Sequence, residues 1–178
     1  MVDAWLLLNI ALIVIWFCVM IVGVSILWPF IVRGAAWTPT PQGVVHKMLE
    51  LAKVTSDDTV VDLGSGDGRI IITAARDYGA RAIGIEVDPF RILWSRWSIR
   101  RKGVQDRVKV IGGNFFSQNL SLATVVTVFQ RIGTNNRLRA KLAFELASGT
   151  RVVSYQHLFE DWAPSKTTRD PDIYLYII

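Results

Sequence analysis

An acidic residue followed by three evenly spaced glycines is the pattern in this sequence most able to do chemistry. The segment VVDLGSGDGRI has the spacing D-x-G-x-G-x-G, formed by Asp62, Gly64, Gly66 and Gly68. Glycines let the backbone turn sharply and approach a ligand closely, and we expect a helix that begins near Asp67 to point unpaired amides at the same place. The motif departs from the dinucleotide fingerprint, and its acid disfavours a pyrophosphate. It suits the cationic amino-acid moiety of S-adenosylmethionine, whose ammonium Asp62 can hold directly or through water.

Two more candidate ligand residues follow predicted strands. Glu86 ends the second strand, 22 residues after Gly64, at a position from which an acid accepts ribose hydroxyls in open α/β sheets. The segment GGNFF after the third strand places Asn114 to pair with an adenine edge and Phe115 to lie against the ring. Together with the glycine motif, these residues predict an S-adenosylmethionine site, although a solvated strand end remains the alternative for Glu86.

Alternating strands and helices are predicted to position these residues. Apolar runs predict strands at 59–64, 80–86, 107–111, 124–129, 150–155 and 172–178, with a short strand around 166–168. Helical patterns lie between them, including one that ends near Gly79 and one over 135–146. Continuously apolar strands separated by helices indicate an α/β fold with a parallel, doubly wound sheet covered on both faces.

The first helix of this domain has a start signal. Thr40 is the expected N-cap and Pro41 the first helical residue. Its apolar face at helical spacing is formed by Val44, Val45, Met48, Leu49 and Ala52.

A later helix begins at Asp88 and closes at Gly103. One side of it is apolar, with Phe90, Leu93, Trp94 and Trp97, and the other holds Arg91, Ser95, Ser98 and Lys102. An apolar side of this kind is typical of a helix face that packs on a core.

The amino-terminal run is long enough to cross a membrane. From Ala4 to Val32 the sequence has 29 positions without Asp, Glu, Lys, Arg or His, more than the roughly 20 that a span needs. A cleaved signal peptide would have a basic start and a shorter apolar core, so we expect a retained anchor over 4–32. Arg33, Lys47 and Lys53 follow the run, and the positive-inside rule then predicts a single-pass protein with its domain in the cytosol.

Composition limits the remaining chemistry. Residues 33–178 hold all 20 Lys and Arg and 14 of the 15 Asp and Glu, and their formal charge is +6. Cys18 is the only cysteine, which excludes a disulfide within the chain, and with no CxxC motif and two histidines there is no ligand set for a structural zinc site.

A basic group occurs in the middle of the chain. The simplest interpretation of this group is a solvated helix face. A more specific one is contact with anionic lipid headgroups. Binding to nucleic acid is disfavoured because no aromatic interleaving or RNA-binding module accompanies the charge. The group consists of Arg91, Arg96, Arg100, Arg101, Lys102, Arg107 and Lys109.

The chain resembles class I, seven-stranded methyltransferases, and more closely a small family of protein-lysine N-methyltransferases. That family includes an archaeal enzyme of broad substrate range and the membrane-associated mitochondrial enzymes that methylate the ADP/ATP carrier and the ATP synthase c-subunit. The resembling stretches are TPTPQGVVHKMLELA, VVDLGSGDGRIIITAA, GARAIGIEVDP, GGNFF, VVTVF, NNRLRAKL and SGTRVVS, followed by Trp162.

The resemblance implies a Rossmann-like, seven-stranded methyltransferase domain over 44–178, preceded by a Pro-rich connector over 33–43 and the transmembrane helix. It implies S-adenosylmethionine as cofactor, a protein substrate with an accessible lysine, and the mitochondrial inner membrane if the source is eukaryotic. The implied cofactor residues are Asp62, Gly64, Ser65, Gly66, Gly68, Glu86 and Asn114, with Thr40 and Pro41 near the pocket. The chain departs from the family at Phe129, often Tyr, and at Gly133-Thr134-Asn135, often Ser-Val-Asn.

Methyl transfer to an amine needs a positioning channel more than a nucleophile. Thr127, Phe129 and Gln130 follow or end the fourth strand and are the candidate lining, because ligands of open α/β sheets bind beyond these strand ends. Ordinary strand packing is the alternative for Thr127 and Gln130, and Trp162 either closes the rim or packs in the core.

The sequence therefore favours a membrane-anchored protein-lysine N-methyltransferase that acts on membrane proteins. Two alternatives stay open. One is a methyltransferase for a lipid amine or small amphiphile, and the other is a catalytically silent cofactor-binding scaffold. The intact cofactor motif disfavours the scaffold.

Overall fold

The structure is a computed structural model that describes residues 4–31 and 38–178. Val32 and Arg33, the end of the expected anchor and the first charge after it, lie outside the described residues. The chain divides into two compact units, the second of which is Thr38–Ile178.

The first unit contains one helix, α1 (Ala4–Ile31). Its segment Trp5–Ile26 is 22 residues long, has a mean hydropathy of 2.8 and buries none of its side chains within the chain. The polar side chain of Asn9 is satisfied inside the helix, because its Nδ2 donates to the Trp5 carbonyl oxygen at 2.7 Å. The helix is therefore long and apolar enough to be a candidate membrane span.

The second unit is built on a seven-stranded sheet in the order β3-β2-β1-β4-β5-β7-β6. The strands are β1 (Thr59–Leu63), β2 (Arg81–Glu86), β3 (Val108–Gly112), β4 (Val125–Val128), β5 (Arg151–Tyr155), β6 (Lys166–Thr168) and β7 (Ile173–Ile177). β1 to β5 are parallel, and β7 runs antiparallel between β5 and β6.

The predicted strands and the doubly wound arrangement are confirmed, but the prediction of a wholly parallel sheet is wrong for β6 and β7. Only residues 169–172 separate these two strands. A connection of that length joins antiparallel neighbours, whereas a parallel pair needs a crossover of a dozen or more residues.

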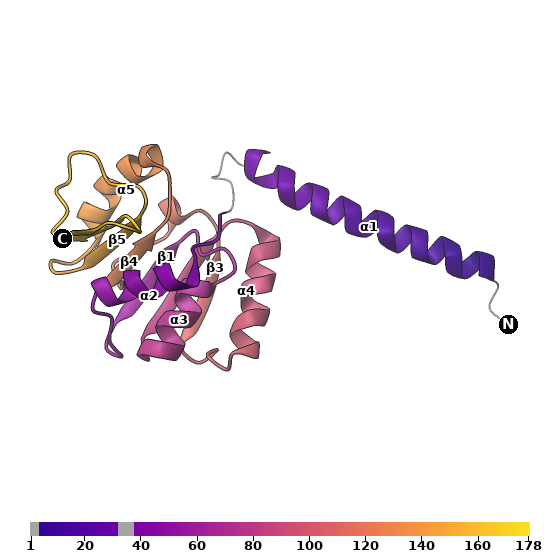
Figure 1. The fold of residues 1–178 in the computed structure, drawn as a ribbon, viewed down its shortest axis with the longest axis horizontal. Helices are drawn as coiled ribbons and strands as arrows, with labels where there is room; N and C mark the ends of the chain where they lie inside the picture. The colour runs from indigo at the N-terminus through magenta and orange to yellow at the C-terminus, as the bar shows by residue number, and fades with distance from the viewer. Residues whose placement is uncertain (1–3, 32–37) are drawn as a thin grey trace. The chain divides into compact units, whose positions relative to one another are not determined.

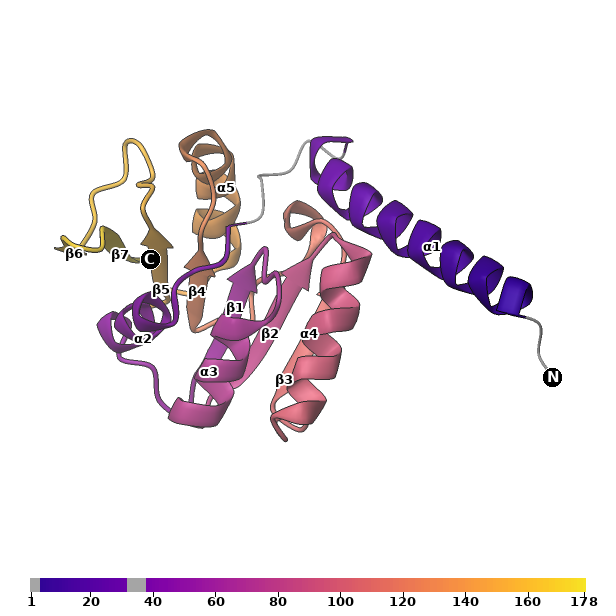
Figure 2. The same cartoon turned by 45° about the vertical axis from the view of Figure 1, so that its right-hand side comes forward.

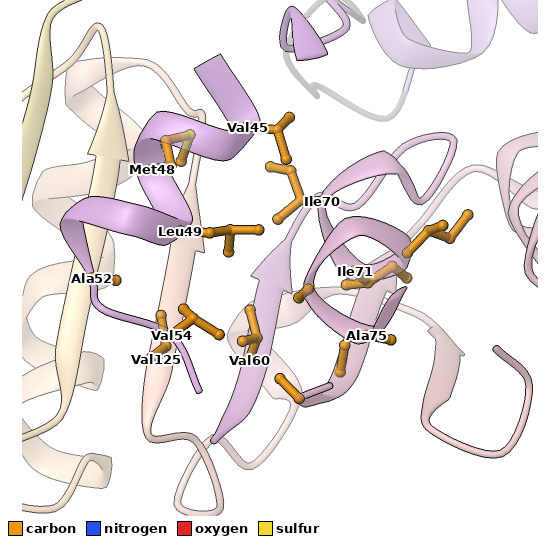
Figure 3. Close-up of a cluster of buried hydrophobic side chains, with 14 of the residues drawn as sticks. Val45, Met48, Leu49, Ala52, Val54, Val60, Ile70, Ile71, Ala75 and Val125 are labelled. Carbon is orange, nitrogen blue, oxygen red and sulfur yellow. The ribbon is translucent and has the colours of Figure 1, made fainter. Parts of the chain in front are cut away.

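Helices cover both faces of the sheet, as Figures 1 and 2 show. One face carries α2 (Gln42–Leu51), α3 (Arg69–Tyr78) and α4 (Pro89–Arg101), and the other carries α5 (Ile132–Glu145). Figure 3 shows side chains of α2 and α3 packed together above β1 and β4. The predicted apolar face of the first helix is confirmed, since its members are Val44, Val45, Met48, Leu49 and Ala52, all buried.

Two helix starts differ from the prediction. Pro41 is the N-cap of α2, where Thr40 was expected, and its carbonyl oxygen accepts from the Val44 and Val45 amides at 2.9 and 3.1 Å. The N-cap needs a carbonyl acceptor and extended backbone, and Pro41 supplies both without a side-chain bond. α5 begins at Ile132, three residues before the expected Asn135, so the segment that departs from the family lies within its first turn.

The predicted packing face of α4 is wrong. Leu93, Trp94 and Trp97 are 63%, 59% and 49% exposed, whereas Ser95 and Ile99 are buried. Both sides of this helix carry apolar residues, so periodicity alone could not choose between them. The packing face is decided by how closely α4 approaches Gly68. The Ser95 Cβ lies 3.1 Å from where a Cβ on Gly68 would be, which leaves no room for a tryptophan.

Candidate active site

The glycine motif forms the tight loop between β1 and α3. Gly64, Gly66 and Gly68 have φ values of 89°, 54° and 84°, a left-handed region that favours glycine. Gly68 is the N-cap of α3, so the helix begins at Arg69 and not near Asp67. The loop therefore follows the carboxyl end of β1 at the edge where the parallel strands end.

The loop amides bond within the protein and not toward a ligand. The Gly64 and Ser65 amides donate to the Ile85 carbonyl oxygen at 2.9 and 3.0 Å. The Gly66 amide donates to Glu86 Oε2 at 2.8 Å, and the Gly68 amide donates back into the loop. The expectation of unpaired amides at the helix start is wrong for Gly68 and for Arg69, whose amide donates to Asp67 Oδ1 at 3.2 Å. The paired loop amides are not offered to a phosphate group.

Glu86 fastens the glycine loop to the end of β2. Besides accepting from Gly66, its other carboxylate oxygen, Oε1, accepts from the Val87 and Asp88 amides, each at 2.9 Å. The side chain is buried. A carboxylate oxygen has two lone-pair sites, so Oε2 keeps one acceptor site for a further donor. The alternative of a solvated strand end is therefore wrong.

Asp62 and Thr127 form a buried pair beneath this loop. The Thr127 hydroxyl donates to Asp62 Oδ1 at 2.8 Å across the neighbouring strands β1 and β4. Burial raises the pKa of Asp62 to about 7; the Thr127 bond opposes this rise, and the charges of Glu86 and Asp67 add to it. Thr127 is fully buried, so it positions Asp62 and does not line a substrate channel as predicted.

Ser65 lies under the loop against β2. A Cβ on Gly84 would come within 2.5 Å of Ser65 Oγ, which is why only glycine fits there. The hydroxyl is buried and has no hydrogen-bond partner among the described residues. Its predicted contact with a cofactor therefore requires a ligand atom that reaches beneath the loop.

Gln130 contacts the same loop from the end of β4. Its Nε2 donates to the Leu63 carbonyl oxygen at 3.1 Å. A Cβ on Gly64 would lie 2.5 Å from that Nε2, so Gln130 and the glycine fit together closely. The structure thus places Gln130 at the glycine loop, as a residue that supports it.

Three aromatic rings meet where β4 and β5 end. Half-buried Phe129 lies 4.6 Å from the Tyr155 ring centroid and 6.4 Å from the His157 ring centroid, with the His157 ring nearly parallel to it. Phe129 was predicted as channel lining, but sequence reasoning missed Tyr155 and His157. Their position at the end of the next parallel strand was the available signal.

Asn135 holds the segment that carries His157. Its Nδ2 donates to Ser154 Oγ at 3.2 Å and to the carbonyl oxygens of His157 and Leu158 at 2.9 and 3.3 Å. The side chain is fully buried. The asparagine that this chain shares with the family pattern therefore fixes the loop after β5.

Asn114 and Phe115 follow β3, as predicted. Asn114 is exposed, and its Oδ1 accepts from the Phe116 amide at 3.0 Å, which caps a short helical turn. That bond leaves the amide nitrogen of Asn114 available as a donor. Phe115 is half-buried, and its ring centroid lies 4.9 Å from that of Phe116.

Arg69 connects the glycine loop to the backbone at Thr40, next to Pro41. Arg69 Nη1 donates to the Thr40 carbonyl oxygen at 2.8 Å, and Arg69 Nη2 binds Asp67 at 2.6 Å. Trp162, in contrast, stacks 5.1 Å from Tyr176 and packs edge-on against Phe159, so the structure favours the core alternative for it.

The donor set fits S-adenosylmethionine. Among the described residues, no three His, Cys, Asp or Glu side chains gather as ligands. The Asp62 carboxyl has a raised pKa, which an adjacent ammonium would lower again, and Glu86 keeps an acceptor site at a strand end. The sheet order and this site define a seven-stranded, S-adenosylmethionine-dependent methyltransferase.

The family follows from sequence similarity. Residues 62–166 match the family described as the ANTKMT methyltransferase domain. A protein-lysine N-methyltransferase of Saccharolobus islandicus is 45% identical over 149 residues, which are 80% of this chain and 92% of that protein. The lysine N-methyltransferase of the ATP synthase c-subunit from Rattus norvegicus is 36% identical over 109 residues, which are 61% of this chain but only 50% of the rat protein. The chain belongs to this methyltransferase family.

A solved structure agrees with the cofactor. The crystal structure of an RNA methyltransferase from Salinibacter ruber in complex with S-adenosyl-L-homocysteine is 43% identical, with a TM-score of 0.78. The similarity covers 79% of this chain and 94% of that one. S-adenosylhomocysteine is what remains of S-adenosylmethionine after methyl transfer, so the similarity supports the same cofactor here.

The raised pKa of Asp62 makes the stability of the cofactor-free protein depend on pH. The folded state keeps this proton up to about pH 7, whereas the ordinary pKa of an Asp carboxyl is 3.8. The stabilisation is therefore fully present below 3.8 and is lost as the pH rises to about 7, by up to about 1.4 kcal/mol per pH unit. Asp62→Asn should remove this slope in urea unfolding measured from about pH 4 to about pH 8.

Asp57→Asn, which neutralises an exposed carboxylate before the start of β1, is the matched control and should keep the slope. Equal slopes in the two variants would contradict the assignment to Asp62.

Proposed function

We propose that this chain transfers methyl groups from S-adenosylmethionine to lysine side chains of proteins. The observation that carries the proposal is the 45% identity to a protein-lysine N-methyltransferase over 92% of that relative's length. The aromatic group at the ends of β4 and β5 supports it, because such rings suit the apolar stem of a lysine.

In this proposal each cofactor moiety has a partner at a strand end. Asp62 accepts from the amino-acid ammonium, Glu86 accepts from the ribose hydroxyls, and Asn114 pairs with the adenine edge while Phe115 lies against the ring. The glycine loop gives close backbone approach, and its fixed shape depends on Gln130 and Glu86. Thr40 and Pro41 flank the loop through Arg69.

The chain's own contribution to the chemistry is alignment and desolvation. When bound, S-adenosylmethionine supplies a sulfonium methyl group, so that a nitrogen–carbon bond forms as the carbon–sulfur bond breaks and its electron pair stays on sulfur. A free lysine has a pKa near 10.4 and is neutral in only about one molecule in 10³ at pH 7. A desolvating channel lowers that pKa, the proton leaves to solvent, and the amine is held at about 3–3.5 Å from the methyl carbon.

Phe129, Tyr155 and His157 are the proposed wall of that channel. Phe129 lacks the hydroxyl that family members often have, but the Tyr155 ring lies against it, and the Tyr155 hydroxyl accepts from Gln156 Nε2 at 3.1 Å. The Asn135 side chain holds the His157 backbone in place by donating to its carbonyl oxygen. The wall is therefore assembled from two adjacent strand ends and fixed by a buried amide.

Replacing Glu86 tests the cofactor assignment. Glu86→Ala should weaken S-adenosylmethionine binding by about 1.5–3 kcal/mol, because charged hydrogen bonds to the cofactor are lost. Titration calorimetry measures the affinity, and thermal unfolding reports the separate loss of the three bonds to backbone amides. Glu50→Ala, which removes an exposed carboxylate of α2, is the control. Unchanged affinity in Glu86→Ala would remove Glu86 from the cofactor site.

We further propose that α1 anchors the protein in a membrane by a single pass, with the catalytic domain in the cytosol. If the source is eukaryotic, the membrane proposed for this anchor is the mitochondrial inner membrane. The support is the length and hydropathy of Trp5–Ile26 and the absence of buried side chains in it. Lys47 and Lys53, both exposed at or just beyond α2, agree with the positive-inside rule.

A second candidate function is methyl transfer to RNA. The observation that favours it is the 43% identity to the Salinibacter ruber protein, which is described as an RNA methyltransferase. Lysine methylation is preferred because two relatives from different organisms, Saccharolobus islandicus and Rattus norvegicus, are both described as lysine N-methyltransferases.

A labelling experiment decides between these acceptors. The full chain is incubated with methyl-labelled S-adenosylmethionine and membranes, a soluble lysine-rich protein, or RNA. We expect methyl-lysine in acid hydrolysates of the protein fractions. Label recovered in RNA or in extracted lipid, with none in protein, would overturn the lysine proposal, and Glu86→Ala controls for label that does not depend on the site.

Deleting residues 1–32 tests the proposed anchor. The connector before Thr40 is about eight residues, which even fully extended reach about 26–29 Å, so the domain stays near the membrane and meets its lysines at high effective concentration. We expect the deletion to leave methylation of a soluble test protein nearly intact and to reduce methylation of native membrane proteins sharply.

Rates on both substrates are measured with the same preparation. Equal loss on both would show that the segment supports the fold. Equal retention on both would show that tethering does not select the substrate.

A further inference from the structure

α4 carries an exposed apolar surface that the sheet does not use. We call it the α4 aromatic face, formed by Phe90, Leu93, Trp94 and Trp97, which are 38%, 63%, 59% and 49% exposed. Their spacing places them along one stripe of the helix. The rings of Trp94 and Trp97 contact each other, with centroids 5.2 Å apart.

The opposite side of α4 already supplies the contact with the domain. Ser95 and Ile99 are buried, and Ile92 packs against the same core. The α4 aromatic face is therefore surplus to folding. Two tryptophans and a leucine in water are costly, because burial of apolar side chains is favourable, and an exposed surface of this kind marks an interaction site.

Basic residues flank the face. The 13 residues of α4 contain no Asp or Glu, while Arg96, Arg100 and Arg101 are exposed and Lys102 follows directly. The Arg101 guanidinium lies 5.1 Å from the Trp97 ring centroid, so one charge sits over an exposed aromatic ring. Tryptophan, phenylalanine and leucine beside arginine and lysine are residue types found at membrane interfaces.

We propose that the α4 aromatic face binds the surface of an anionic lipid bilayer. The tryptophans lie at the level of the headgroups, where an apolar ring with a polar N–H is most stable, and the arginines and Lys102 contact anionic headgroups. The same chain has a candidate span, which would keep this helix within reach of the bilayer. The inference rests on that proposed anchor for its geometry, but not on lysine as the acceptor.

This contact would set the direction in which the active site faces. α4 starts directly beside Glu86, whose carboxylate accepts from the Val87 and Asp88 amides. Val87 is 45% exposed and extends the apolar surface toward that end. A bilayer against α4 therefore lies next to the strand ends that hold the proposed cofactor site, and the acceptors within reach are groups close to the lipid surface.

Lipid-borne quenchers test the proposal on the full chain. Three single-cysteine proteins carry an environment-sensitive fluorophore: the native chain labelled at Cys18, Leu93→Cys with Cys18→Ser, and Phe144→Cys with Cys18→Ser. Cys18 reports α1, and Phe144 is the matched control, because it is an apolar residue of α5 that is 91% exposed. Each protein is placed in nanodiscs of phosphatidylcholine with about one third phosphatidylglycerol, with doxyl groups at shallow or deep positions.

We expect the Leu93 label to be quenched by shallow doxyl lipid at least about twofold more than the Phe144 label, as for an interfacial helix. Pure phosphatidylcholine should reduce this quenching. The Cys18 label should be quenched by deep doxyl lipid, which reports the span independently.

A Leu93 label no more quenched than the Phe144 label, in discs where Cys18 is deeply quenched, would overturn the proposal while leaving the anchor in place. A Leu93 label protected from both doxyl lipid and aqueous iodide would also overturn it, because a protein partner or a second copy would then cover the face. A Cys18 label that escapes deep quenching contradicts the proposed anchor instead. Circular dichroism should show the same overall helix content in all three labelled proteins.

Discussion

The active site depends on one buried carboxylate. Glu86 accepts three backbone N–H groups, two from the turn that starts α4 and one from the centre of the glycine loop. Bonds from amides to a charged acceptor are stronger than neutral ones, and a buried amide without an acceptor is costly. The ends of β1 and β2 therefore keep a fixed relation, and everything the loop contributes to ligand binding depends on that relation.

Asp62 shows why the same region is poised for a cation. Its carboxyl is buried and feels the charges of two other acids, and among the described residues the Thr127 hydroxyl offsets the cost of its charge. The loop amides that could have served an anion are consumed by the Ile85 carbonyl and by Glu86. The site therefore favours a cationic group over an anionic one, because its loop amides are already paired and its side chains are acidic.

Most of the fold could be predicted, because continuous apolar runs mark the strands, and the residues proposed as ligands do lie at strand ends. Asp62, Glu86 and Asn114 were proposed as ligands for this reason. The face of α4 could not be predicted, since both sides are apolar and the choice is made by Ser95 fitting against Gly68. Nor could the roles of Thr127 and Gln130, whose partners lie 65 and 67 residues away in sequence. Tyr155 and His157 were missed because their contact with Phe129 exists only once β4 and β5 are neighbours.

Arg69 has a mechanical consequence. Its guanidinium binds Asp67 of the glycine loop and the Thr40 carbonyl oxygen, so the start of the folded domain is clipped to the loop. Few residues separate Thr40 from α1 along the sequence. A displacement of Thr40 would therefore reach the glycine loop directly through Arg69, as well as α2 along the chain.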